Sequence, residues 1–284
     1  MTSVDVRFVA GKARSFLELI RPVTVMLGLM GVFVGGILGG FQLVSLDLLF
    51  AMVVVVFMVA GAMALNDYFD VEVDRIVHSR RPIPSGRLSA KECLQFAYVS
   101  FFIALVLSAA INILSFGIII FGISLLALYE RYFKNAGLAG NIVTAFISSM
   151  ALIFGGAAVG QAHNALILAA MTFLIMLGRE ILKDVEDIEG DILTRMTLPM
   201  KIGRKNALYA GCLAIIATIV LIPFPYWWNI LSLWYIVIIV AAGMLFIYSI
   251  ILVLKDIKNI GTTIEILRSG SAFALVGFIV GVLT

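Results

Sequence analysis

The chain is built from nine apolar stretches, each about as long as a helix that crosses a lipid bilayer. A spanning helix needs about 20 mostly apolar residues, and in a bilayer only helices and closed barrels satisfy their own backbone polar groups. Hydrophobic residues make up 62% of the 284 residues and charged residues 13%, whereas soluble domains are about half apolar and a quarter charged. We therefore predict an all-α polytopic membrane protein. The nine predicted spans are residues 22–41, 46–66, 92–111, 113–130, 138–160, 164–182, 206–223, 230–254 and 264–283.

Basic and non-basic turns alternate between these spans, and this alternation predicts the orientation in the membrane. The turns 74–91 and 183–205 carry five Lys or Arg residues each, whereas the turns that follow them, near residue 112 and at 223–229, carry none. Basic loops are retained in the cytoplasm. We therefore expect a multi-pass protein of the cell membrane, with its N-terminus in the cytoplasm and its C-terminus outside.

One acidic pattern occurs twice with the same spacing. Ten of the 17 acidic residues fall in residues 67–74 and 180–191. The match extends beyond the aspartates, because Gly86 and Gly203 keep the same offset. The matched aspartates are Asp67, Asp70 and Asp74 in the first copy and Asp184, Asp187 and Asp191 in the second, 117 residues later.

The repeat predicts how the two acidic stretches are placed. An even number of predicted spans separates them, so both lie at cytoplasmic helix ends and the repeat is parallel. We expect residues 1–284 to form a single transmembrane domain with repeat motifs at 66–90 and 183–207. The nine helices would then surround a central cavity that both motifs face and that opens to the cytoplasmic side.

The spacing of the aspartates indicates a divalent cation. Helix positions i, i+3 and i+7 fall within about 60° of one another, so each triplet shares a face. Like charges at these spacings repel, and charge near hydrocarbon is costly. A solvated helix end explains one such cluster but not two with the same spacing, and oxygen ligands without His or Cys select Mg²⁺. The expected metal ligands are Asn66, Asp70, Asp74, Asp187 and Asp191, and all six aspartates are expected in the catalytic site.

Basic residues follow both acidic stretches and indicate a substrate with phosphate groups. Magnesium held by few protein oxygens usually bridges to phosphate, although the positive-inside rule alone also explains these basic residues. Arg179 either pairs with the neighbouring Glu180 or holds a phosphate. Residues 81–86 contain two prolines, which disfavour a helix, and are expected to form a cap over the cavity. The candidate substrate-binding residues are Asn66, Arg81, Arg87, Arg21, Lys134, Arg179, Lys201 and Arg204.

Two segments resemble the paired signatures of the UbiA-type intramembrane prenyltransferases. Residues 66–74, which begin Asn-Asp-Tyr-Phe-Asp and end in Asp, and residues 81–86, Arg-Pro-Ile-Pro-Ser-Gly, resemble the first signature. Residues 183–191, Lys-Asp-Val-Glu-Asp-Ile-Glu-Gly-Asp, resemble the second. The resemblance extends over essentially the whole chain. With Arg179-Glu180 just before it, the second signature most resembles that of archaeal digeranylgeranylglyceryl phosphate synthases.

This resemblance implies a reaction in membrane ether-lipid biosynthesis. A geranylgeranyl group would pass from geranylgeranyl diphosphate to the glycerol hydroxyl of geranylgeranylglyceryl phosphate, with Mg²⁺ gripping the diphosphate and neutralising the leaving charge. The acceptor phosphate would need its own basic anchor, for which Arg21, Lys134 and Arg179 are candidates, although Arg21 could equally mark only the end of the first span. No general base is evident. We expect membrane lipids around the protein, no nucleic acid and no obligatory protein partner.

Two alternatives remain open from the sequence. A UbiA-type enzyme could instead prenylate an aromatic acceptor in a quinone, haem O or chlorophyll pathway. A secondary transporter also has internal repeats and intramembrane carboxylates, but its sites favour the bilayer midplane and broken helices. Acidic helix ends beside basic loops favour phosphate chemistry over transport.

Overall fold

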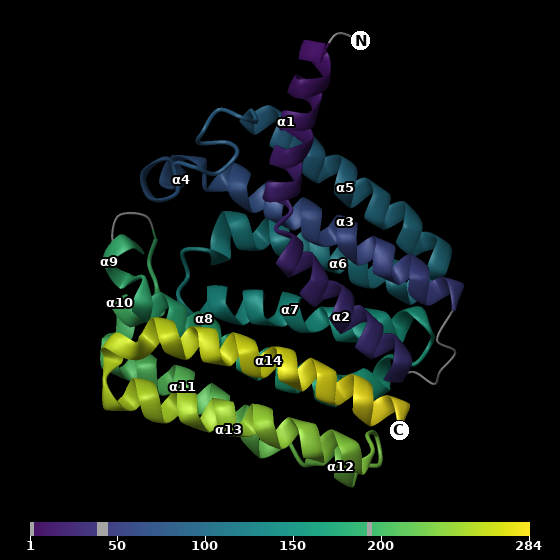
Figure 1. Ribbon diagram of the computed structural model, residues 1–284, viewed down its shortest axis with the longest axis vertical. Helices are drawn as coiled ribbons and strands as arrows, with labels where there is room; N and C mark the ends of the chain where they lie inside the picture. The colour runs from purple at the N-terminus through teal and green to yellow at the C-terminus, as the bar shows by residue number, and fades with distance from the viewer. Residues whose placement is uncertain (1–2, 39–44, 192–194) are drawn as a thin grey trace.

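The structure, a computed structural model, describes residues 3–38, 45–191 and 195–284, and the side chains of residues 11–38, 45–190 and 195–284. Every regular element in these ranges is a helix (Figure 1). Eight helices are long and apolar enough to cross a membrane, or up to nine if the bent pair formed by α1 and α2 is one span. In chain order the helices are α1 (Ser3–Leu19), α2 (Pro22–Leu38), α3 (Leu46–Phe69), α4 (Val71–Val77), α5 (Ala90–Ile111), α6 (Ile113–Leu128), the π-helix η1 (Tyr129–Phe133), α7 (Leu138–Ala158), the 3-10 helix η2 (Ala162–Ala165), α8 (Leu166–Glu186), α9 (Ile188–Asp191), α10 (Leu198–Ile202), α11 (Arg204–Leu221), α12 (Phe224–Trp227), α13 (Leu233–Lys255), the 3-10 helix η3 (Ile257–Asn259) and α14 (Ile260–Leu283).

The observed helices confirm the all-α polytopic prediction, with one difference that concerns the acidic stretches. The predicted spans ended at residues 66 and 182, whereas α3 continues to Phe69 and α8 to Glu186. Asp67 and Asp184 therefore lie inside long helices instead of in the turns after them. The helices can continue because partners on other helices satisfy both buried carboxylates, as described below.

The long helices pack as two groups placed side by side (Figure 1). One apolar core joins α2, α3, α5, α6 and α7, and a second joins α8, α11, α13 and α14. Val34 and Leu38 of α2 and Leu152 of α7 belong to the second core, so they connect the two groups. The short helices α4, α9 and α10 lie at one end of the bundle, and α12 and the C-terminus lie at the other (Figure 1). Both acidic stretches are therefore at the same end.

Two glycines bring the backbones of α2 and α7 close together where these helices cross. A Cβ atom added to Gly35 would lie 1.9 Å from the carbonyl oxygen of Leu152, and one added to Gly155 would lie 2.0 Å from that of Val32. Real atoms do not approach so closely, so only glycine fits at these two points. Small residues commonly allow membrane helices to approach backbone to backbone in this way.

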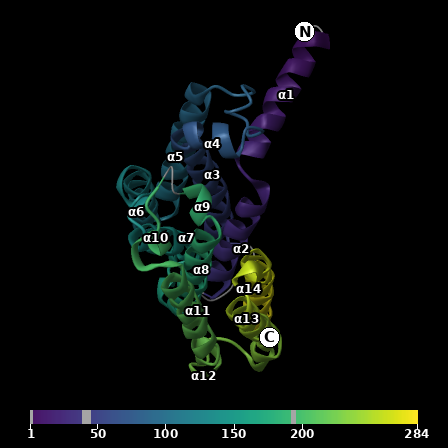
Figure 2. The same cartoon turned by 90° about the vertical axis from the view of Figure 1, so that its left-hand side faces the viewer.

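Helix α1 projects away from the bundle beside α4 and the start of α5 (Figure 2). Its segment 11–19 meets α2 at an angle of 52°. Arg21 forms the corner and has a φ of 51°, which is uncommon for a residue with a side chain. Ion pairs from Lys12 to Glu92 and from Arg87 to Glu18 attach α1 to the start of α5 and to the turn before it.

Candidate active site

The first acidic stretch lies where α3 gives way to α4. Asn66 and Asp67 are in the last turn of α3, Asp70 separates the two helices with φ −88° and ψ 3°, and Asp74 lies in α4. Hydrogen bonds from Asp70 N to Asn66 O (2.9 Å) and from Asp74 N to Asp70 O (2.8 Å) continue the helical pattern through the junction. Asp67 and Asp74 can therefore face the same way, as their spacing predicted.

Two arginines neutralise the buried aspartates of this stretch. The Asp67 carboxylate accepts a hydrogen bond from Arg21 at 2.6 Å and has Arg81 at 3.7 Å. Asp74 accepts one from Arg81 at 2.6 Å. Both aspartates are only 2–3% exposed. Arg81 thus reaches from the predicted cap into the bundle, and the uncommon backbone of Arg21 is held by its ion pair, which is typical of strained residues at functional sites.

Lys134 binds the third aspartate of this stretch. Its ammonium group lies 2.6 Å from Asp70 and 2.7 Å from Glu130, and its side chain is 14% exposed. Glu130, 3% exposed, also accepts a hydrogen bond from the Asn66 amide at 3.1 Å. The amide nitrogen of Asn66 is thereby occupied, which leaves its oxygen as the atom suited to a metal ion.

The second acidic stretch has the same backbone shape as the first. Asp187 separates α8 from α9 with φ −86° and ψ 4°, close to the values at Asp70. Asp184 is buried in α8 and accepts a hydrogen bond from the Asn141 amide of α7 at 2.9 Å. Asp187 makes no ion pair with any side chain that the structure describes. The side chain of Asp191 lies outside the described part.

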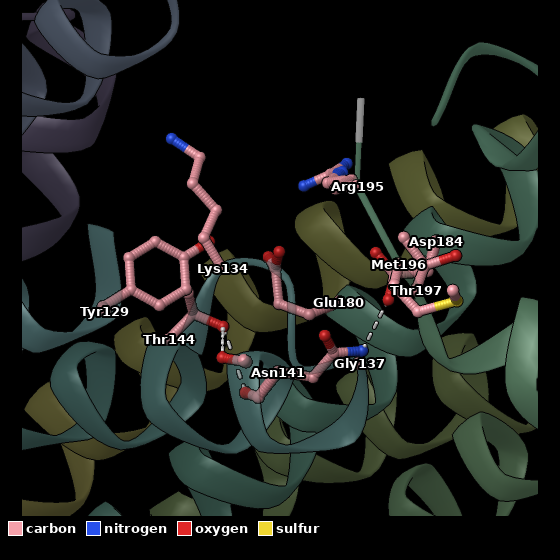
Figure 3. A pocket seen from close by; sticks show the side chains of 11 residues that line it. Tyr129, Lys134, Gly137, Asn141, Thr144, Glu180, Asp184, Arg195, Met196 and Thr197 are labelled. Atoms are coloured by element: carbon pink, nitrogen blue, oxygen red, sulfur yellow. Dashed lines mark hydrogen bonds between the residues drawn. The ribbon is translucent and has the colours of Figure 1, made fainter. Parts of the chain in front are cut away.

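One pocket lies beside the second acidic stretch and is linked to the first through Lys134 (Figure 3). It opens between η1, the start of α7, the end of α8 and residues 195–197. Lys134 lines it while binding Asp70 of the first stretch, and Asp184 of the second stretch lines it from the other side. The lining residues are Tyr129, Lys134, Gly137, Gly140, Asn141, Thr144, Glu180, Asp184, Arg195, Met196 and Thr197.

Six of the seven predicted basic residues lie outside the lining of this pocket. Arg21 and Arg81 pair with the first acidic stretch, and the other four lie elsewhere. Arg87 donates to Glu18 at 2.5 and 2.9 Å and supports α1. Lys201 is exposed and donates to the carbonyl of Ala136 at 3.0 Å. Arg204 is exposed at the start of α11. Arg179 pairs with Glu180 at 2.8 Å, which is the first of the two interpretations that the sequence left open. The structure brings none of the four into the pocket lining.

The donor atoms of the two stretches suit magnesium when substrate phosphates complete the coordination. Among the described residues, no three His, Cys, Asp or Glu side chains are grouped closely enough to hold a metal ion. Magnesium usually binds to one or two carboxylates plus phosphate oxygens and water. Asn66 and Asp70 on one side and Asp187 on the other can supply such oxygens. Their site would recruit the ion together with its phosphate ligand.

Comparison with known proteins decides the family. The model of the UbiA prenyltransferase family matches residues 26–263. The chain belongs to this family. It is therefore an intramembrane prenyltransferase, and the transporter alternative is set aside. The resemblance seen in the two acidic signatures is confirmed over most of the chain.

Individual UbiA relatives point to one branch of the family. A digeranylgeranylglyceryl phosphate synthase from Methanosarcina mazei is 38% identical over 234 residues, which cover 80% of each chain. A solved structure of a digeranylgeranylglyceryl phosphate synthase is 32% identical with a TM-score of 0.80, and the match covers 96% of this chain and 99% of that one. A UbiA homologue from Archaeoglobus fulgidus, bound to GPP and Mg²⁺, is 20% identical with a TM-score of 0.71, covering 94% and 98%, and shares the fold.

Several residues at the site were not predicted from the sequence. Glu130 forms an i,i+4 pair with the predicted Lys134 at the end of a predicted span, and that spacing was a usable signal. Asn141 was an isolated amide in an apolar helix, which is also a usable signal. Thr197 is buried, and its hydroxyl has no hydrogen-bond partner among the described residues. Tyr129 and Thr197 gave no signal, because only the folded chain shows that they line a pocket.

Proposed function

We propose that the protein transfers a geranylgeranyl group from geranylgeranyl diphosphate to the glycerol hydroxyl of geranylgeranylglyceryl phosphate, in a Mg²⁺-dependent reaction of membrane ether-lipid biosynthesis. The observation that carries the choice of substrates is the similarity to digeranylgeranylglyceryl phosphate synthases, at 38% identity over 80% of the chain. The Mg²⁺ and GPP bound to the Archaeoglobus fulgidus homologue support the diphosphate and the metal as a class.

The side chains of the two acidic stretches suit this chemistry. Asn66, Asp70 and Asp187 would hold the magnesium ion, which supplies charge neutralisation to the diphosphate leaving group. Lys134 already binds the Asp70 carboxylate, and its positive charge is available to phosphate oxygens once the metal neutralises that carboxylate. Arg81, which pairs with Asp74, adds positive charge beside the same stretch. Oriented charges of this kind stabilise a departing diphosphate without a covalent intermediate.

The acceptor phosphate would be held by basic residues apart from the metal. Arg21 is about one-third exposed and lies at the corner between α1 and α2, beside the first stretch. An arginine can grip phosphate in a bidentate manner, which a lysine cannot. We propose Arg21 as this anchor, in keeping with its partly exposed side chain.

The proposed orientation places the pocket on the cytoplasmic side. The basic turns 74–91 and 183–205 lie at the end of the bundle that carries both acidic stretches. Retention of basic loops in the cytoplasm then places the N-terminus inside and the C-terminus outside. Internal repetition at 66–90 and 183–207 is supported by the matched backbone at Asp70 and Asp187.

The decisive experiment supplies the purified protein, in detergent or lipid, with geranylgeranyl diphosphate, Mg²⁺ and a panel of acceptors. Products are resolved by mass spectrometry. Formation of the diether phosphate from geranylgeranylglyceryl phosphate supports the proposal. Prenylation of an aromatic acid, with none of the glycerol lipid converted, would replace it with the aromatic-acceptor alternative.

A further inference from the structure

The proposed reaction releases a proton that some group must receive. When the glycerol oxygen bonds to the allylic carbon, the oxygen becomes positively charged until its hydrogen leaves. We infer that the carboxylate of Glu180 accepts this proton. This inference rests on the proposed function, because only a hydroxyl acceptor carries the proton in question.

Glu180 is positioned to meet an acceptor in the pocket. It lies on α8 one helical turn before Asp184 and belongs to the pocket lining. Figure 3 shows its carboxylate pointing into the space between the side chains of Lys134 and Arg195. Its side chain is 23% exposed, so a ligand in the pocket can reach it. Hydroxyl groups within hydrogen-bond reach of a carboxylate can transfer a proton to it.

The other acid groups near the pocket are already engaged. Asp184 is buried and accepts a hydrogen bond from Asn141. Glu130 is 3% exposed and is held by Asn66 and Lys134. Neither has the combination of an open face and few partners that a proton acceptor needs.

The remaining polar groups of the pocket cannot readily take a proton. Lys134 and Arg195 are cations, and Tyr129 is a phenol that holds its own proton at neutral pH. The hydroxyl of Thr144 donates to carbonyl oxygens of its own helix at 3.0 and 3.1 Å. Glu180 is therefore the pocket residue whose carboxylate oxygen can accept the proton.

Arg179 gives the carboxylate its orientation. Its guanidinium donates to Oε1 of Glu180 at 2.8 Å. Within the described part of the chain this is the one hydrogen bond of Glu180, so Oε2 is the oxygen available to a substrate.

Bond breaking, bond formation and proton transfer together conserve atoms and charge. The bond between the allylic carbon and the diphosphate oxygen breaks, and its electron pair leaves with the diphosphate. A lone pair of the glycerol oxygen forms the new ether bond to that carbon. The hydrogen of the hydroxyl passes to Oε2 of Glu180, which later returns it to water.

The test separates bond cleavage from ether formation in the purified full-length protein. Geranylgeranyl diphosphate labelled with oxygen-18 at the bridging position reports cleavage, because the label scrambles when the bond breaks and reforms. In Glu180→Gln we expect ether formation to fall about a hundredfold or more, as for loss of a general base. Scrambling and the KM for geranylgeranylglyceryl phosphate should stay within about threefold of the wild-type values.

The control is Asp47→Asn. Asp47 is an exposed carboxylate in the first turn of α3, at the opposite end of that helix from Asn66 and Asp67. Its ether formation should equal that of the wild type. The conservative variant Glu180→Asp should recover part of the activity that the glutamine variant loses.

Each result bears on the inference. Near-normal ether formation in Glu180→Gln would overturn it, and would indicate that the departing diphosphate takes the proton. Parallel loss of scrambling and ether formation would also overturn it, because Glu180 would then serve the cleavage step or the fold. If the wild-type protein forms no ether from the glycerol lipid, the proposed function itself fails, whatever the variants do.

Discussion

The two acidic stretches share their spacing and backbone shape but differ in electrical surroundings. In the first, all three aspartates contact cations, which are Arg21, Arg81 and Lys134. In the second, Asp187 pairs with no cation that the structure describes, while Asp184 has the Asn141 amide of α7 among its partners. Most of these partners come from segments outside the repeated motifs, namely the α1–α2 corner, the end of η1 and α7. A repeated sequence thus sets the spacing of the carboxylates, while segments outside the repeat supply most of their partners.

Removal of divalent metal tests both stretches together and should have the largest effect. We expect transfer to stop in excess chelator and to return when Mg²⁺ is added, because carboxylates alone cannot hold a diphosphate. Product formation would be followed by mass spectrometry. Full turnover in chelator would mean that the basic residues beside the first stretch bind the diphosphate without a metal.

Substitution of one aspartate in each stretch tests whether the two act equally. Asp70→Asn and Asp187→Asn should each lower turnover about a hundredfold, as expected for loss of a charge-stabilising group. Each change is isosteric and removes like-charge repulsion, so folding should persist. The control is Glu72→Gln, an exposed neighbour that pairs with Arg75. A normal rate in either aspartate variant would remove that stretch from the site.

The contrast in cation partners also predicts a difference in stability. Arg81→Gln leaves two buried aspartates with weaker neutralisation and should lower the free energy of unfolding by about 2 kcal/mol. Arg204→Gln, at an exposed position after the second stretch, should change it by less than about 0.5 kcal/mol. Thermal unfolding in one detergent would compare the two variants. Equal changes in unfolding temperature would show that the ion pairs of Arg81 with Asp67 and Asp74 contribute little to stability.

Arg21 should give the smallest effect, confined to one substrate. Arg21→Gln is expected to raise the KM for geranylgeranylglyceryl phosphate about fivefold and that for geranylgeranyl diphosphate less, because it removes binding and not chemistry. Steady-state kinetics with each substrate varied in turn would show this. Arg14→Gln, an exposed change on α1, is the control. An unchanged KM for geranylgeranylglyceryl phosphate would mean that Arg21 pairs with Asp67 and does not bind the acceptor.

The sequence predicted the fold well because membrane helices carry strong local signals. Hydrophobic length and basic turns identify a span without knowledge of its neighbours. The predicted boundaries were too short at α3 and α8, because composition marks where charge begins and not where the helix ends. Asp67 and Asp184 remain helical because distant partners, Arg21 and Asn141, satisfy them.

The candidate site was harder to predict because its contacts join residues far apart in the chain. The repeat gave Arg87 and Arg204 equivalent positions, but the structure places Arg87 against Glu18. Glu18 lies outside the repeated motifs, so repeat symmetry could not foresee that contact. Lys134 shows the same limit, since its contact with Asp70 depends on how α6 packs beside α3. Residue type and spacing indicated the chemistry of the site, whereas tertiary packing determines which basic residue contacts which carboxylate.

The glycine crossing of α2 and α7 restricts the route of a long isoprenoid tail. Where Gly35 and Gly155 bring the two backbones together, even one additional carbon atom has no room. A hydrocarbon chain that extends from the pocket toward the lipid therefore cannot leave through this seam. The isoprenoid tail of either substrate must therefore pass between other helices, and the α2–α7 crossing limits the directions in which it can extend.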